Sequence, residues 1–157
     1  MIILGIDPGT ARIGVGLIEY KNKKAAIKCY NCFTTSAGDS TAARLDDLHK
    51  QLAKFIKKHK PDIMAVEELF FFKNLTTAIK VSQARGVILL AAAQQGLKIY
   101  EYTPLQIKQA LTGYGRAEKN QIQQMVKMIL SLKEIPQPDD AADALAIAIC
   151  CAHSLKI

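Results

Sequence analysis

The chain has 157 residues, of which half are apolar and 22% are charged, and this composition excludes a disordered or fibrous protein. Lys and Arg total 21 against 14 for Asp and Glu, so the net charge is +7 and an anionic partner is favoured, either nucleic acid or a membrane surface. The longest apolar run, residues 144–152, is shorter than the roughly 20 residues that a membrane-spanning helix needs. We therefore expect one domain, residues 1–157, with no membrane segment and a cytoplasmic location.

The first part of the chain predicts an antiparallel meander of three strands, followed by a helix and a fourth strand. The three strands are expected at residues 1–7, 12–20 and 25–34. A helix then begins at Ser40 or Thr41, because apolar residues recur at helical spacing until Pro61. Residues 62–67 are apolar on both faces, as expected for a central strand that helices cover.

The remainder of the chain predicts four helices and one more strand. We expect helices at residues 75–95, from 104, at 118–130 and at 139–154, a strand at 97–100 and a glycine-containing loop at 112–117. This order of elements predicts an α/β fold in which helices flank a mixed five-stranded sheet. Residues 87–93 are apolar all round, so one face of their helix should pack on the sheet and another against a second subunit or under the last helix.

The four cysteines allow a zinc site, which we consider and do not favour. Cys29 and Cys32 could join Cys150 and His153 as four ligands. However, an odd offset within a strand points the first two side chains to opposite faces. Cys150 and Cys151 end an apolar helix, where small buried thiols are common.

Four acidic residues lie at positions where a purely structural role is hard to justify. Asp7 and Glu67 each end an apolar strand, while Asp140 and Asp143 are three residues apart and so share one helix face. Asp7 could be a turn residue, and Asp139 is expected to cap the last helix. Asp143 lies a turn inside an apolar helix, where an unpaired buried charge costs several kcal/mol.

Convergence of these four carboxylates would require cations to offset their repulsion. Oxygen ligands in that number suit Mg²⁺ or Mn²⁺ rather than zinc. Two such ions about 4 Å apart are the usual arrangement for displacement at a phosphodiester. An acidic metal pocket in a basic chain favours a nuclease.

Five motifs in order resemble the RuvC family of bacterial Holliday-junction resolvases, which have the ribonuclease-H-like fold. The motifs are Asp7-Pro-Gly-Thr-x-x-x-Gly14, Glu67 after an apolar strand, Gln83-Ala-Arg-Gly-Val87, Ala117-Glu-Lys119 and Asp140-Ala-Ala-Asp-Ala-Leu-Ala-Ile-Ala148. The similarity runs from residue 1 to about residue 153. It implies a crossover junction endodeoxyribonuclease, a hydrolase that nicks two opposing strands symmetrically in DNA recombination and repair.

The resemblance also implies the ligands, cofactor and partners. Asp7, Glu67, Asp140 and Asp143 would be catalytic and would bind two Mg²⁺ ions, with Mn²⁺ as a possible substitute. Were the strand shifted by one residue, Glu68 would replace Glu67. The expected partners are four-way junction DNA, a second copy of the chain in a homodimer, and the branch-migration proteins RuvA and RuvB.

Basic and aromatic residues near these acids have expected roles in DNA binding. Lys108 and Lys119 match basic residues at the family's active site, where an ammonium would offset charge on the reacting phosphate. Phe70 matches a position at which an aromatic ring stacks on unpaired bases. Arg85 lies in a family motif, and Arg116 lies in the 112–117 loop, where it could contact a phosphate. Solvated surface lysines and a phenylalanine packed in the core are the structural alternatives.

Three other functions are weighed against the junction nuclease. An RNA-processing nuclease of the same fold is the main alternative, because substrate choice does not follow from metal chemistry. An actin-like sugar kinase shares an Asp-x-Gly-Thr motif but encloses its nucleotide between two domains, and this chain predicts one. A non-catalytic DNA-binding module is disfavoured, because burying four acidic side chains that have no function would cost folding free energy.

Overall fold

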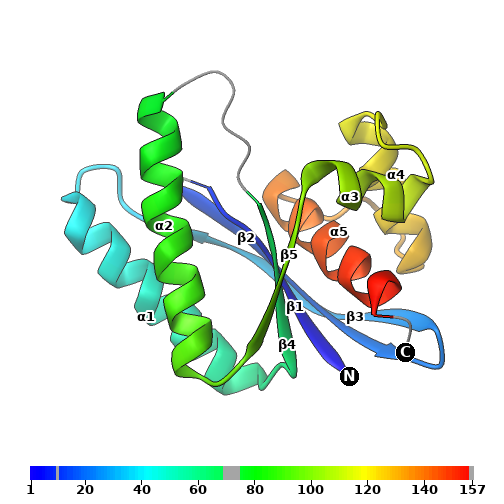
Figure 1. The fold of residues 1–157 in the computed structure, drawn as a ribbon, viewed down its shortest axis with the longest axis horizontal. Helices are drawn as coiled ribbons and strands as arrows, with labels where there is room; N and C mark the ends of the chain where they lie inside the picture. The colour runs from blue at the N-terminus through cyan, green and yellow to red at the C-terminus, as the bar shows by residue number, and fades with distance from the viewer. Residues whose placement is uncertain (10, 69–74, 156–157) are drawn as a thin grey trace.

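The computed structural model describes residues 1–9, 11–68 and 75–155, and the predicted meander is confirmed. The five strands are β1 (Ile2–Asp7), β2 (Arg12–Lys21), β3 (Lys24–Thr34), β4 (Ile63–Glu67) and β5 (Lys98–Tyr102). They form one sheet in the order β3-β2-β1-β4-β5. The first three strands pair antiparallel, and β4 runs parallel to both β1 and β5 (Figure 1), so the sheet is mixed as predicted.

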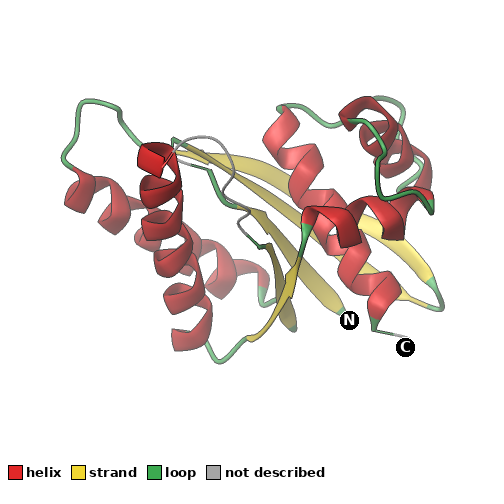
Figure 2. Ribbon diagram, turned by 45° about the horizontal axis from the view of Figure 1, so that its top comes forward, coloured by secondary structure: helices red, strands yellow, loops and turns green. Residues whose placement is uncertain are grey.

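Helices cover both faces of this sheet. They are α1 (Thr41–His59), α2 (Leu75–Gln94), α3 (Pro104–Thr112), α4 (Lys119–Ile129) and α5 (Asp139–Ser154). One apolar core joins α1 and α2 to one face, and a second core joins α3, α4 and α5 to the other (Figures 1 and 2). Because α2 and α5 lie on opposite faces, burial of α2 under the last helix is excluded. In the described ranges, no helix combines the length and apolar character needed to span a bilayer.

Side-chain caps explain where two of these helices begin. The Ser40 hydroxyl accepts a hydrogen bond from the Ala43 backbone N–H at the start of α1. Thr103 and Gln106 form a reciprocal capping box at the start of α3. The first residue of α3 is Pro104, and its lack of an N–H costs nothing there, because an N–H at the first position of a helix has no partner within the helix.

Two sequence-based expectations differ from the structure. β5 extends to Tyr102 rather than ending at Tyr100, because Glu67 at the end of β4 pairs with Tyr102. Asp139 does not cap α5: Pro138 occupies the N-cap position, and Asp139 lies in the first turn. The Asp139 carboxylate instead pairs with Lys119, 3.3 Å away.

Three glycines bring α5 into backbone contact with the sheet. A Cβ atom at Gly5 would lie 2.0 Å from the Ala144 carbonyl oxygen, one at Gly14 would lie 1.8 Å from the Asp140 carbonyl oxygen, and one at Gly16 would lie 2.7 Å from the Leu145 backbone nitrogen. Any side chain on these residues would therefore push the helix away. This close contact holds the N-terminal half of α5 against β1 and β2.

Candidate active site

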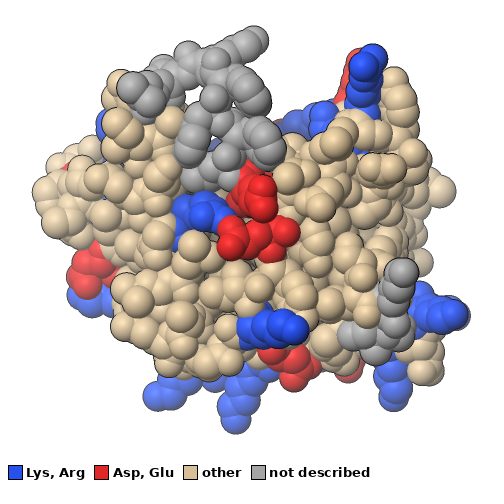
Figure 3. All heavy atoms as spheres, in the orientation of Figure 1, with Lys and Arg blue, Asp and Glu red and all other residues tan. Residues whose placement is uncertain are grey.

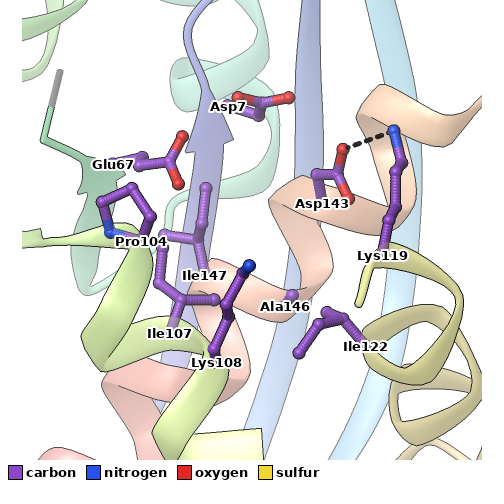
Figure 4. Close-up of a pocket in the computed structure, with 10 residues that line it drawn as sticks. All are labelled: Asp7, Glu67, Pro104, Ile107, Lys108, Lys119, Ile122, Asp143, Ala146 and Ile147. Carbon is purple, nitrogen blue, oxygen red and sulfur yellow. Dashed lines mark ion pairs between the residues drawn. The ribbon is translucent and has the colours of Figure 1, made fainter. Parts of the chain in front are cut away.

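A pocket of about 190 Å³ opens where β1 and β4 end, beside α5. Its lining residues come from β1, β4, α3, α4 and α5: Asp7, Glu67, Pro104, Ile107, Lys108, Lys119, Ile122, Asp143, Ala146 and Ile147. The three carboxylates and the Lys108 ammonium point toward one space above an apolar floor (Figure 4). On the surface, acidic side chains gather near the middle of one face, with basic side chains next to them (Figure 3).

Strand alternation places the two strand-end acids in this pocket. Ile3 of β1 and Ala65 of β4 pack in the core beneath α5, and Asp7 and Glu67 follow them at even offsets on the same face. Since β1 and β4 are neighbours in parallel register, the two carboxylates lie side by side. Glu67 lines the pocket, as the family register implied, whereas Glu68 is not among the lining residues.

Burial and mutual repulsion disfavour the ionised form of these acids. Burial, together with the charges of Glu67, Asp143 and Asp140, raises the pKa of Asp7 to about 7 against a smaller opposing effect of Lys119. Burial and the Asp143 charge likewise raise the pKa of Glu67 to about 7, although the Lys108 ammonium lowers it in part. The pocket therefore holds more negative charge than its two lysines neutralise.

Lys119 connects the pocket to the start of α5. Its ammonium lies 3.1 Å from Asp143 Oδ2 and 3.3 Å from Asp139 Oδ2. Partial burial lowers the pKa of the Lys119 ammonium, but these two ion pairs outweigh it and raise the pKa overall. Burial raises the pKa of Asp143, and the bond from Lys119 opposes that rise. Lys119 is also the first residue of α4, where the helix dipole disfavours a cation, so the acids of α5 hold it there.

Asp140, the fourth acid expected at the site, does not line the pocket. Its Oδ2 lies 3.2 Å from Arg12 Nε at the start of β2. The Cys32 thiol on β3 donates to the same oxygen over 4.0 Å. The structure thus brings Asp7, Glu67 and Asp143 together and directs Asp140 toward the β2–β3 side of α5.

The residues expected to contact DNA lie in different surroundings. Arg85 on α2 has only 19% of its side chain exposed, forms an ion pair with Glu101, and donates to the Glu67 carbonyl oxygen over 3.4 Å. Arg116 is exposed in the loop between α3 and α4. Phe70 lies outside the described residues.

The pocket's donor set fits a hard divalent cation better than zinc. As the side chains stand in the described ranges, no three acidic, His or Cys residues are gathered closely enough to hold a metal ion. Three carboxylates nevertheless face one space, and a divalent cation there would relieve the repulsion that raises the pKa of Asp7. For the zinc alternative, Cys29 lies beside His59 on the α1 face while Cys32 lies beside Asp140 on the α5 face, so the two thiols do not converge.

The raised pKa values predict how stability depends on pH. In the folded protein the pKa values of Asp7 and Glu67 are about 7, against ordinary values of 3.8 and 4.5, so between about pH 4 and pH 7 the folded state binds more protons than the unfolded state. The metal-free protein should therefore lose stability as the pH rises through this range. Melting temperatures in EDTA at pH 5 and pH 8 measure the loss, which should be smaller in Asp7→Asn. Parallel losses in both proteins would contradict this assignment.

Comparison with known proteins identifies the family to which these residues belong. Residues 3–151 match the family described as crossover junction endodeoxyribonuclease RuvC. The chain belongs to the RuvC family. A RuvC of Desulfitobacterium hafniense is 60% identical over 157 residues, which cover 100% of this chain and 95% of that protein.

Solved structures of RuvC share the fold along almost the whole chain. A Thermus thermophilus RuvC structure matches with a TM-score of 0.93 and 38% identity over 99% of this chain and 96% of that one. The same protein in complex with a Holliday junction substrate matches with a TM-score of 0.91 and 35% identity over the same shares. The family and the ribonuclease-H-like fold expected from the sequence are thus confirmed.

Sequence reasoning did not assign Arg12 or the structural contacts of Arg85. Arg12 was only the first residue of an expected strand, yet it pairs with Asp140. Arg85, which is predicted to contact DNA, also donates to the backbone carbonyl oxygen of Glu67, a contact that the sequence does not predict. Arg12 lies within the first family motif, only two residues before Gly14, and this was the one available signal.

Proposed function

We propose that this chain is a metal-dependent endonuclease that resolves Holliday junctions by symmetric nicking of two opposing strands, in DNA recombination and repair. The observation that carries the proposal is a pocket in which three carboxylates meet two lysines at the strand ends of a RuvC-family chain. A solved complex of the Thermus thermophilus relative with a Holliday junction substrate supports this substrate over structured RNA.

Each residue of the pocket has a role in this proposal. Asp7, Glu67 and Asp143, joined by Asp140, would hold two Mg²⁺ ions, for which Mn²⁺ could substitute. Such ions, when bound, polarise the phosphate and activate the attacking water. The raised pKa of about 7 for Asp7 and Glu67 means that these carboxylates release protons on binding a cation near neutral pH.

Lys119 and Lys108 act on the substrate phosphate by charge. Lys119→Ala removes a cation from beside the reacting group, so we expect cleavage to fall by about 10²-fold while most junction binding is retained. Rates under single-turnover conditions and junction affinity in Ca²⁺ would be measured together, with Lys127→Ala on the same helix as a control. A Lys119→Ala variant that cuts at the wild-type rate would remove Lys119 from the mechanism.

Further DNA contacts are proposed for Phe70, Arg116 and Arg85. Phe70 would stack on a base unpaired at the crossover, so Phe70→Ala should lose about 1–3 kcal/mol of binding free energy for an opened junction. Arg116, exposed on its loop, would bind a phosphate, and Arg85 would have to leave Glu101 to do so. Strand opening would be measured by 2-aminopurine fluorescence. If Phe70→Ala changed neither junction affinity nor strand opening, the stacking role would be excluded.

The assembly state, partners and location form part of the same proposal. Ile79 and Leu90 of α2 are 54% and 52% exposed, and an apolar helix face of this kind suits a homodimer whose two-fold axis matches a symmetric junction. RuvA and RuvB would supply the junction during branch migration. We place this single domain in the cytoplasm, where the DNA is. The four free cysteines agree with that location, because thiols stay reduced there. A monomer in sedimentation at micromolar concentration would count against the dimer.

The deciding experiment compares cleavage of a labelled mobile four-way junction, a matched duplex and a structured RNA, each with and without Mg²⁺. Paired symmetric nicks on the junction alone, absent in Asp143→Asn, would support the proposal. RNA cleavage with an intact junction would favour the processing nuclease. Tight junction binding with no cleavage would favour a non-catalytic module.

A further inference from the structure

The two acids at the start of α5 are held by different basic residues, although they share one helix face. The Asp143 carboxylate lines the pocket and pairs with Lys119. The Asp140 carboxylate pairs with Arg12 and accepts the Cys32 thiol, outside the pocket lining. Asp140 nevertheless lies near enough for its charge to act on Asp7.

The sheet register explains why Arg12 is placed to take this carboxylate. Gly14 faces the Asp140 backbone with no side chain between them, and Arg12 lies two residues earlier on the same face of β2. Cys32 is the β3 partner of Gly14, and its thiol donates to the same carboxylate oxygen that Arg12 contacts. Contacts from two strands therefore fix one side-chain direction for Asp140.

The pair is exposed enough to be broken. The Arg12 and Asp140 side chains are 55% and 30% exposed, and ion pairs of this exposure contribute little net stability. A divalent cation in the pocket would attract the Asp140 carboxylate more strongly than a half-exposed guanidinium does, but it must first displace that guanidinium. Arginine stays charged at every relevant pH, so pH alone does not release the carboxylate.

We propose that Arg12 is a positioning residue that holds Asp140 out of the pocket and so competes with the divalent cation for the fourth carboxylate. This inference rests on the proposed metal site. Arg12 then sets the cation concentration at which the site is completed, without touching the reacting atoms.

The test is a double-mutant cycle in which the affinity of the full chain for Mn²⁺ is measured. Calorimetry and the electron paramagnetic resonance signal of free Mn²⁺ both report this affinity. The proteins are wild type, Arg12→Gln, Asp140→Asn, the double variant and Asp7→Asn. We expect Arg12→Gln to tighten Mn²⁺ binding by about two- to fivefold, the range of a half-exposed ion pair. Asp140→Asn should weaken binding, and Arg12→Gln should have no effect in the Asp140→Asn background.

The cycle separates competition for Asp140 from a general effect of charge. If Arg12→Gln tightens binding equally with and without Asp140, removal of a positive charge accounts for the effect and the inference fails. If Mn²⁺ binding requires Asp7 but its affinity is the same in Arg12→Gln as in the wild type, the inference fails while the proposed function stands. If Mn²⁺ binding does not require Asp7, the metal site and the inference fail together. Far-UV circular dichroism would verify that each variant is folded.

Discussion

Asp7→Asn is expected to abolish junction cleavage and, in the absence of metal, to raise the melting temperature of the protein. The two effects have one physical cause. The Asp7 carboxylate is largely buried beside Glu67 and Asp143, and this environment raises its pKa to about 7. An ionised group held there destabilises the fold when no cation is bound, yet the same charge is what a cation would bind.

The expected magnitudes follow from that environment. Loss of the charged ligand should reduce cleavage by at least about 100-fold, the effect of removing one preorganised electrostatic group. Relief of the repulsion at pH 8 should stabilise the metal-free protein by about 1–2 kcal/mol, or about 3–6 °C in Tm. Single-turnover cleavage rates and thermal unfolding in EDTA measure the two quantities.

A control substitution of the same kind separates the site from a general effect of charge. Asp46→Asn removes an exposed acid of α1 that pairs with Lys50, far from the pocket. It should change neither cleavage nor stability appreciably. An Asp7→Asn variant that is inactive but no more stable than wild type would mean that repulsion does not dominate the metal-free pocket.

The acids at the strand ends could be found from the sequence because a polar residue ends an otherwise apolar strand. Alternation separated Glu67 from Glu68, and the family register rather than the pattern itself selected Glu67; in the structure Glu67 lies beside Asp7, because β4 and β1 are parallel neighbours. The spacing of Asp140 and Asp143 correctly predicted one helix face. It could not predict where each side chain points, since that depends on Arg12 and Lys119, which come from distant elements.

The element boundaries followed local signals where those signals were strong. Ser40 caps the start of α1, because its hydroxyl accepts a hydrogen bond from a backbone N–H that has no partner within the helix, and this pattern is visible in the sequence. The end of β5 could not be read locally, because it is fixed by pairing of Tyr102 with Glu67 of β4. Likewise, the start of α5 at Asp139 follows from Pro138 at the N-cap position rather than from a capping acid.

Small residues connect the stability of the fold to the geometry of the site. The α5 helix carries two of the four expected acids, and its position depends on backbone contact with Gly5, Gly14 and Gly16. Gly14 is the most direct link, because its neighbour across the contact is the backbone of Asp140 itself. It also pairs with Asp7 in the sheet. A substitution at Gly14 should therefore displace both the acids of α5 and Asp7 of β1.

Gly14→Ala is expected to destabilise the protein by about 3–5 kcal/mol and to reduce cleavage in the fraction that remains folded. The added Cβ would lie 1.8 Å from the Asp140 carbonyl oxygen, and a backbone atom in a helix cannot move aside as a flexible side chain can. The start of α5 must shift, which displaces both of its acids from Asp7.

Gly86→Ala provides the matched control for this prediction. Gly86 lies within α2, and a Cβ there meets nothing within 4 Å, so the same substitution should stabilise the helix by about 0.5–1 kcal/mol. Urea unfolding of both variants at one protein concentration would give the two free energies. If both substitutions changed the free energy of unfolding by the same small amount, α5 could move away from β2 without destabilising the protein. The close backbone contact would then not be what positions Asp140.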